Sequence, residues 1–334
     1  AYELCGRDWS STCALPICEY QRKTGASSAG WPEKMKIHNL FFIVLAIVTA
    51  ISLICVWFIP SVQDFMAGNT MWNGIRTFSE DVSATLLGSM ENLSDNPDKN
   101  ILISIPYLPY SQVELEDIRN FMESGGTLLI ADDYGYGNQL LEYFGVTIRF
   151  NGKPVLDPLF CYKTQWFPEI TEFAAPGDFQ LVILNHATVL QGVSTEQVIA
   201  WTTASSYIDS NENLKRDEYE IKGQMPIAAK TNIGEGVLIV VSDPSLMINT
   251  MVNRADNFAF ISFLLGERSG KDVLFDTTHL SQTPLDISKT ALVRNRDVMS
   301  TPYPLTALIL VIFIGVSIWM LRTGGEVGKQ PQNS

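Results

Sequence analysis

The stretch of sequence that decides the fold is residues 110–150, YSQVELEDIRNFMESGGTLLIADDYGYGNQLLEYFGVTIRF. The apolar residues within 113–122 recur at helical spacing, and Gly125-Gly126 ends that helix. Residues 127–131 form an apolar run that is too short for a helix and is predicted to be a buried strand. A second helix is predicted to begin near Asn138, a residue that favours the N-cap position.

Short apolar runs continue to alternate with helical patterns along the chain. Predicted strands are residues 101–105, 146–150, 181–184, 237–241 and 273–275, and a helix is predicted over 258–265. Residues 61–95 predict a helical approach to the sheet, and residues 151–178, rich in proline, predict an excursion from it. Buried strands that alternate with helices indicate an α/β fold with a mostly parallel sheet and helices on both faces.

Two apolar runs predict membrane spans on either side of this domain. Residues 40–59, LFFIVLAIVTAISLICVWFI, carry no charge and are long enough to cross a hydrocarbon core of about 30 Å. They predict a transmembrane helix or an uncleaved signal anchor, because no small-residue cleavage motif follows them. Residues 305–321 form the second run, with Tyr303 and Trp319 as interfacial aromatic residues.

The positions of basic residues predict the orientation in the membrane. Lys34, Lys36, Arg322 and Lys329 flank the outer ends of the two spans, which predicts that both termini are cytoplasmic. The opposing observation is a basic group at Lys289, Arg294 and Arg296 on the other side of the second span. We therefore expect a first span over residues 35–60, an extracytoplasmic domain over 61–304, a second span over 305–322 and a cytoplasmic tail over 323–334.

Residues 1–34 differ in character from the rest of the chain. The segment CGRDWSSTCALPIC, residues 5–18, resembles translated sequencing-adapter sequence, so we expect residues 1–34 to add nothing to the fold and Met35 to be the natural start. The alternative is a small zinc or disulfide knot built on Cys5, Cys13 and Cys18, although these have no nearby histidine to complete a zinc site.

Charge excludes one class of partner. The 334 residues include 23 Lys and Arg against 36 Asp and Glu, a formal net charge of -13. Binding to nucleic acid depends on Lys and Arg that neutralise phosphates, and the chain has no basic block. We expect no nucleic-acid partner, and composition and motifs predict no particular cofactor or metal.

Polar residues follow three of the predicted strands and form the candidate ligand-binding site. They are Asp132, Asp133, Tyr134, Gly135, Gly137 and Asn138 after the first strand; Asp243, Ser245, Asn249 and Asn257 after the second; and Asp276 and His279 after the third. The carboxyl ends of parallel strands meet at one edge of a sheet, where open α/β folds bind ligands. Carboxylates with a histidine could ligate a metal or perform acid-base chemistry. The alternative is that each aspartate caps a helix or holds a turn.

The segments that carry these residues resemble a known family. Residues 124–146, 242–266 and 273–279, SGGTLLIADDYGYGNQLLEYFGV, SDPSLMINTMVNRADNFAFISFLLG and VLFDTTH, look like a membrane-anchored domain-of-unknown-function family of archaea and bacteria. That family is similar to class I glutamine amidotransferases and to gliding-motility-type auxiliary proteins of ABC transporters. The resemblance implies a flavodoxin-like sheet flanked by two transmembrane helices. It also implies a protein that is often encoded near MoxR-type ATPases. No cysteine stands after a predicted strand, so the amidotransferase nucleophile is missing.

These observations favour a membrane-anchored extracytoplasmic domain that binds a ligand or a protein without catalysis, as a component of a transport or envelope complex. The alternative function is a metal-assisted hydrolase that uses Asp132, Asp133, Asp243 and His279. The two hypotheses differ in geometry, because a hydrolase requires these side chains to converge on a pocket and a binding domain leaves them free to cap helices and turns.

Overall fold

The computed structural model describes residues 37–93, 96–266 and 270–299, together with residues 306, 310, 313, 314 and 317. Its first helix, α1 (Ile37–Phe58), includes the 19-residue segment Leu40–Phe58 with a mean hydropathy of 2.8. Among the described residues, only α1 is long and apolar enough to cross a membrane. Residues 1–34 and most of the predicted second span, 305–321, lie outside the described residues.

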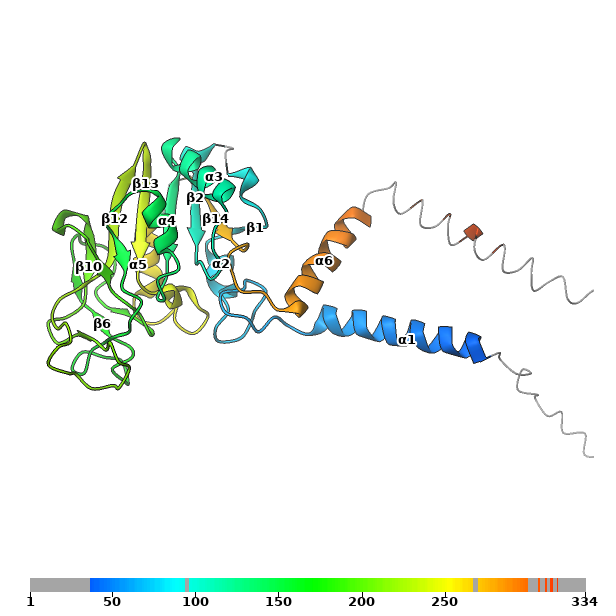
Figure 1. Cartoon of the computed structure of the whole chain (residues 1–334), viewed down its shortest axis with the longest axis horizontal. Helices are drawn as coiled ribbons and strands as arrows, with labels where there is room; N and C mark the ends of the chain where they lie inside the picture. The colour runs from blue at the N-terminus through cyan, green and yellow to red at the C-terminus, as the bar shows by residue number, and fades with distance from the viewer. Residues whose placement is uncertain are drawn as a thin grey trace, which may run out of the picture. The chain divides into compact units, whose positions relative to one another are not determined.

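An eight-stranded sheet forms the centre of the α/β domain. Its order is β1 (Thr85–Leu87), β14 (Asp272–Asp276), β2 (Asn100–Ser104), β3 (Thr127–Ala131), β13 (Gly236–Val241), β12 (Pro226–Ile233), β10 (Val198–Trp201) and β7 (Glu172–Phe173). Neighbouring strands are parallel from β1 to β13 and antiparallel from β13 to β7. Figure 1 shows this arrangement, with β10, β12 and β13 beside β2, β14 and β1. The predicted α/β class and the mainly parallel sheet are confirmed.

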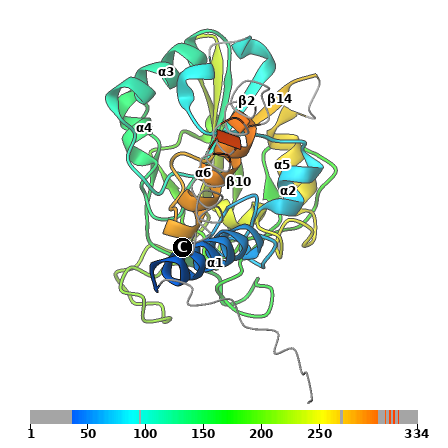
Figure 2. The ribbon, with the colours of Figure 1, turned by 90° about the vertical axis from the view of Figure 1, so that its right-hand side faces the viewer.

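Helices cover both faces of this sheet. Helices α3 (Gln112–Glu123) and α4 (Asn138–Tyr143) lie on one face, and α2 (Arg76–Asp81) and α5 (Asn257–Leu264) lie on the other (Figure 2). The strands supply alternate side chains to the two faces, as the pleat of a strand requires. In β3, Leu128 and Ile130 pack in the core beneath α3 and α4, whereas Leu129 and Ala131 pack in the core beneath α2 and α5. The buried strands are therefore apolar on both sides.

The predicted unit of helix, turn and strand at the centre of the chain is confirmed. Helix α3 begins with a capping box, in which the Ser111 hydroxyl accepts from the Glu114 N–H and the Glu114 carboxylate accepts from the Ser111 N–H. It ends at Glu123 with Ser124 as its C-cap, and the next residue, Gly125, has a φ of 93° in the left-handed region that favours glycine. Strand β3 follows directly and is fully buried.

Several predicted elements differ from the structure. Residues 61–95 are not a continuous helix, because their described part contains only the short α-helix Arg76–Asp81 and a three-residue 3-10 helix, and Leu86 lies in strand β1. The predicted strands 146–150 and 181–184 shorten to β4 (Arg149–Phe150) and β8 (Val182–Ile183), which pair outside the main sheet. Their backbone groups pair with other short strands of the loop region instead.

The remaining elements are short, apart from the last helix. Three two-stranded sheets pair β4 with β9 (Leu190–Gln191), β5 (Val155–Leu156) with β11 (Tyr207–Ile208), and β6 (Glu169–Ile170) with β8. The 3-10 helices are η1 (Met90–Asn92), η2 (Pro97–Lys99), η3 (Thr195–Gln197) and η4 (Pro244–Met247), and the last described helix is α6 (Pro284–Met299). The predicted excursion over 151–178 therefore consists mainly of loops, although its strand β7 joins the edge of the main sheet.

Candidate functional site

Asp132 holds the turn that leaves strand β3. Its carboxylate accepts hydrogen bonds from the backbone N–H groups of Tyr134 at 2.8 Å, Gly135 at 3.1 Å and Gly137 at 2.6 Å. The side chain is only 2% exposed, and this burial raises its pKa even though the three N–H groups act to lower it. Asp132 therefore fixes the backbone of the loop, which matches the turn alternative.

The two glycines and Asn138 complete this turn. Gly135 has a φ of 97°, and a Cβ atom on Gly137 would lie 2.8 Å from Cδ1 of Ile130. Asn138 is the first residue of α4, but its side chain does not cap the helix, and Gly137 holds the N-cap position. The Asn138 amide instead bonds both the N–H and the C=O of Phe150. The predicted start of the helix is confirmed, whereas the predicted N-cap role of Asn138 is wrong.

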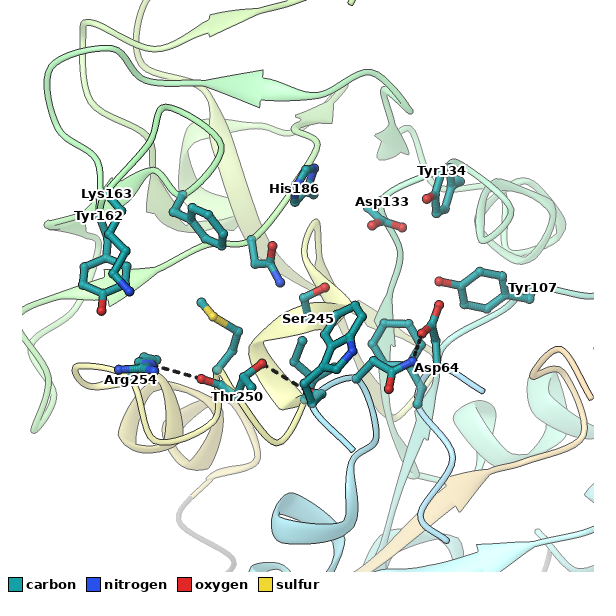
Figure 3. A pocket seen from close by; sticks show the side chains of 17 residues that line it. Asp64, Tyr107, Asp133, Tyr134, Tyr162, Lys163, His186, Ser245, Thr250 and Arg254 are labelled. Carbon is teal, nitrogen blue, oxygen red and sulfur yellow. Dashed lines mark hydrogen bonds between the residues drawn. The ribbon is translucent and has the colours of Figure 1, made fainter. Parts of the chain in front are cut away.

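Asp133 differs from Asp132 because it points into a cavity. No described side chain forms an ion pair with Asp133 or donates a hydrogen bond to it. Burial, and then the neighbouring charge of Asp132, raise the pKa of Asp133 to about 7. Figure 3 shows Asp133 with Tyr134, Tyr107 and Asp64 on one side of the cavity. Within the described part of the chain, Asp133 is therefore a carboxylate without a counter-charge, just after a parallel strand.

The second group of predicted residues follows strand β13 and is used mainly for structure. Asp243 is the N-cap of η4, where it accepts from the Ser245 N–H at 2.8 Å, and it also accepts from the Asn185 N–H at 2.7 Å. Burial raises the pKa of Asp243 well above its usual value. Asn249 binds the backbone of residues 69–77, and Asn257 binds Ile183 and Met251. Of this group, only Ser245 lines the cavity.

The third group, after strand β14, forms a separate buried network. Asp276 bonds Nδ1 of His279 at 2.8 Å and the Ser104 hydroxyl at 2.6 Å, and the Ser104 hydroxyl bonds that of Tyr110 at 2.7 Å. Burial acts to raise the pKa of Asp276, but these bonds and the charge of His279 lower it overall. The other ring nitrogen of His279 lies 3.6 Å from Glu114. Neither Asp276 nor His279 lines the cavity that contains Asp133.

The cavity has a volume of about 440 Å³ and is lined mainly by residues that sequence reasoning missed. Its aromatic lining comprises Phe65, Trp72, Tyr107, Tyr134, Tyr162 and Phe167. The missed residues lie in loops, where no periodic pattern marks them. Tyr107 carries the clearest sequence signal, because it lies just after strand β2, at the same edge of the sheet as Asp133.

The charges of the lining residues are separated across the cavity. Asp64 and Asp133 lie on one side, and Lys163 and Arg254 lie on the other (Figure 3). The Lys163 amine lies 4.9 Å from the centre of the Tyr162 ring, and the Arg254 guanidinium lies 5.9 Å from the same ring. On the acidic side, Tyr107 lies 6.2 Å from both Tyr134 and Tyr136, measured between ring centres.

The predicted carboxylates do not assemble as a group in one place. Among the described residues, no set of three or more His, Cys, Asp and Glu side chains is gathered in a way that could hold a metal ion. Asp132 and Asp243 bind backbone N–H groups, while His279 belongs to the separate network with Asp276. Of the predicted carboxylates, Asp133 alone lines the aromatic cavity, where Asp64 lies on the same side.

The fold and the cavity define a class, an α/β domain with a ligand-sized cavity at the carboxyl ends of parallel strands. Residues 69–265 match the family described as "Domain of unknown function (DUF4350)". The chain belongs to this family, and the expected membership of a domain-of-unknown-function family is confirmed. No curated protein matches the chain.

Some solved structures align with about half of the chain at low identity. The mmIFT52 N-terminal domain is 15% identical, with a TM-score of 0.38, over 51% of this chain and 73% of that domain. A beta-galactosidase from Bacillus circulans sp. alkalophilus is 14% identical, with a TM-score of 0.35, over 54% of this chain and 24% of the galactosidase. Likeness at this level carries no argument about function.

Proposed function

We propose that this protein is a membrane-anchored binding domain, without catalysis, whose cavity takes a small organic molecule that carries a cationic group. The observation that carries the proposal is Asp133, a partly buried carboxylate whose pKa is raised to about 7 and which has no counter-ion among the described residues. A ligand ammonium group beside Asp133 would supply the missing charge. The bound cation and the ionised Asp133 carboxylate would stabilise each other.

The aromatic residues around Asp133 support the same class of ligand. Tyr134 is 63% exposed and Tyr136 is 54% exposed, which is unusual for large rings that pack near one another. Tyrosine faces attract cations that come within about 6 Å of the ring centre. Lys163 and Arg254 across the cavity would bind an acidic group of the same ligand by donating hydrogen bonds to it. Small amino acids and related zwitterions are therefore the first compounds to test.

Binding is preferred to the metal-assisted hydrolase because of how the aspartates are bonded. Asp132 and Asp243 each accept from two or more backbone N–H groups, so a metal would have to displace those bonds. The finer features expected from the resemblance belong to this proposal: a flavodoxin-like sheet, two membrane spans, amidotransferase-like ancestry and partners in a membrane complex with a MoxR-type ATPase.

The ligand test uses the full chain in detergent or nanodiscs. A panel of amino acids, amines and quaternary ammonium compounds is screened by thermal shift, and the affinity of each hit is measured by calorimetry. Asp133→Asn should weaken binding at least tenfold, since loss of a buried charge pair costs more than 1.4 kcal/mol. The exposed Asp178→Asn is the matched control and should bind normally. Unchanged binding by Asp133→Asn, or no hit in the panel, would refute the proposed ligand class.

The anchor and the orientation need a separate test. In sealed right-side-out vesicles, added protease should digest the domain over residues 61–304, because α1 supplies the first span and the basic flanks favour cytoplasmic termini. Protection of the domain in sealed vesicles, with digestion only after detergent is added, would place it in the cytoplasm instead.

A further inference from the structure

A loop outside the cavity has the ligand spacing of a calcium-binding loop. Residues 209–220, which follow strand β11, read DSNENLKRDEYE. Twelve-residue calcium loops take oxygen ligands from positions 1, 3, 5, 7, 9 and 12, with a backbone carbonyl at position 7 and a glutamate at position 12. Those positions hold Asp209, Asn211, Asn213, Lys215, Asp217 and Glu220. The order and spacing match the D-x-[DN]-x-[DN] pattern with its terminal glutamate.

The one departure from the pattern is at position 6, where calcium loops have glycine and this chain has Leu214. Glycine is favoured there because the chain turns sharply. Leu214 has a φ of 62°, in the left-handed region that glycine normally occupies. The backbone therefore makes the required turn although the side chain disfavours it.

Two carboxylates of the loop are buried without a counter-charge. Asp209 is 0% exposed and Glu220 is 5% exposed, and neither forms an ion pair with any described residue. Backbone N–H groups orient them: Asn213 and Leu214 donate to Asp209, and Ser210 and Asp217 donate to Glu220. Buried carboxylates are usually paired with a cation or bound to a metal. This burial is independent of the sequence pattern, and it favours a bound cation because the hydrogen bonds that each carboxylate accepts come from neutral N–H groups.

The amide groups of the loop converge on the third carboxylate. The side-chain nitrogens of Asn211 and Asn213 lie 2.7 Å and 3.0 Å from one oxygen of Asp217. Rotation of each amide by 180° would put its oxygen in that place, at the cost of one bond to a backbone N–H. Asp209, Asp217 and Glu220 are not gathered around one point here, so ion binding would draw the loop inward.

We propose that residues 209–220 bind a calcium ion through these carboxylates, the two amide oxygens and the Lys215 carbonyl. Hard oxygen ligands carried by a loop suit calcium, whereas magnesium requires near-octahedral geometry and keeps several waters. With no His or Cys in the loop, zinc is disfavoured. Because two ligands are neutral amides, we expect weak binding, with a Kd of about 0.1 to 1 mM, the range of extracellular calcium modules.

The test measures calcium binding to the full chain in detergent. After EGTA treatment and dialysis, calcium is titrated by calorimetry, and the melting temperature is recorded with calcium, with magnesium and with neither. Calcium should bind with a stoichiometry of about one and raise the melting temperature by several degrees, and magnesium should do so much less. Saturation at about one ion per chain distinguishes a built site from diffuse attraction to an acidic protein.

Variants within the loop make the test specific. Asp217→Asn, at a partly exposed position, and Glu220→Gln should each weaken calcium binding at least tenfold. Glu218→Gln removes the same charge from an exposed position that the pattern does not use, and should bind calcium like the parent. If Glu220→Gln fails to fold, the calcium affinities of Asp217→Asn and Glu218→Gln still test the proposal. The proposal is wrong if no calcium binds at about 10 mM, a tenfold excess over the weakest expected Kd, or if Asp217→Asn and Glu218→Gln weaken binding equally.

Discussion

Replacing Asp133 by asparagine removes a carboxylate that is difficult to ionise in the folded protein. Burial and the charge of Asp132 raise the pKa of Asp133 to about 7, whereas an aspartate in an unfolded chain has a pKa of about 3.9. Between about pH 4 and pH 7 the folded state binds the proton more tightly, so the free energy of unfolding decreases as the pH rises through this range. The difference of about three pKa units means that Asp133 lowers the free energy of unfolding by at most about 4 kcal/mol at pH 8.

We expect Asp133→Asn to raise the free energy of unfolding by about 1 to 3 kcal/mol at pH 8. The gain is below the upper limit because water in the cavity screens the carboxylate. For a domain of this size the melting temperature should rise by about 3 to 9 °C at pH 8 and by almost nothing at pH 4. The assay is thermal unfolding of the full chain in detergent, followed by circular dichroism at each pH, with Asp178→Asn as an exposed control. An equal change at pH 4 and pH 8, or a lower melting temperature at pH 8, would refute the reasoning.

Three further substitutions test the framework of the site. Asp132→Ala should destabilise the domain by about 1 to 3 kcal/mol, because three N–H groups lose their acceptor, and an unchanged thermal melt would show that the turn does not depend on it. Gly137→Ala should cost about 1 to 3 kcal/mol, because the new methyl group would meet Ile130 and Phe150, whereas Gly88→Ala, with nothing within 4 Å, should be neutral in the same melts. Asp276 keeps a lowered pKa through its bonds to His279, Ser104 and Thr278, so its stabilising effect is present at neutral pH and is lost as the pH falls below about 4. Asp276→Asn should therefore lower the melting temperature at pH 7 and flatten its dependence on pH between about pH 5 and pH 2, and a parallel pH curve for parent and variant would contradict this.

The parallel half of the sheet could be predicted from the sequence because its strands are buried on both faces. Residues 127–131 and 237–241 are unbroken apolar runs, and both lie in the centre of the sheet. Strand β12 was missed because its residues, PIAAKTNI, mix small and polar side chains that leave it partly exposed. Its antiparallel partner, β13, begins just after Gly234 and Glu235, so the two strands form a local hairpin, and Gly234, with a φ of 57°, was the available turn signal. Helix α6 was also missed, although Thr283 and Pro284 are a recognisable start signal.

The candidate site could be located only at the level of the sheet edge. Asp132 and Asp133 are neighbours with the same chemistry, but successive residues at a strand end point in different directions, so one binds the turn and the other faces the cavity. No sequence pattern separates these two roles. The opposite wall of the cavity, with Lys163 and Arg254, comes from loops whose course depends on long-range packing.

The two ends of the main sheet are short, since β1 has three residues and β7 has two. An exposed strand edge can pair with the same edge of another molecule, and long, flat edges are common starting points for aggregation. Proteins held on a membrane diffuse in two dimensions and meet their own copies often, so this hazard grows once a chain is anchored. Edges of two or three residues offer too few backbone groups for a stable intermolecular pair. In the proposed membrane-anchored form, short edges would therefore let the domain be crowded without its central sheet extending from one molecule into the next.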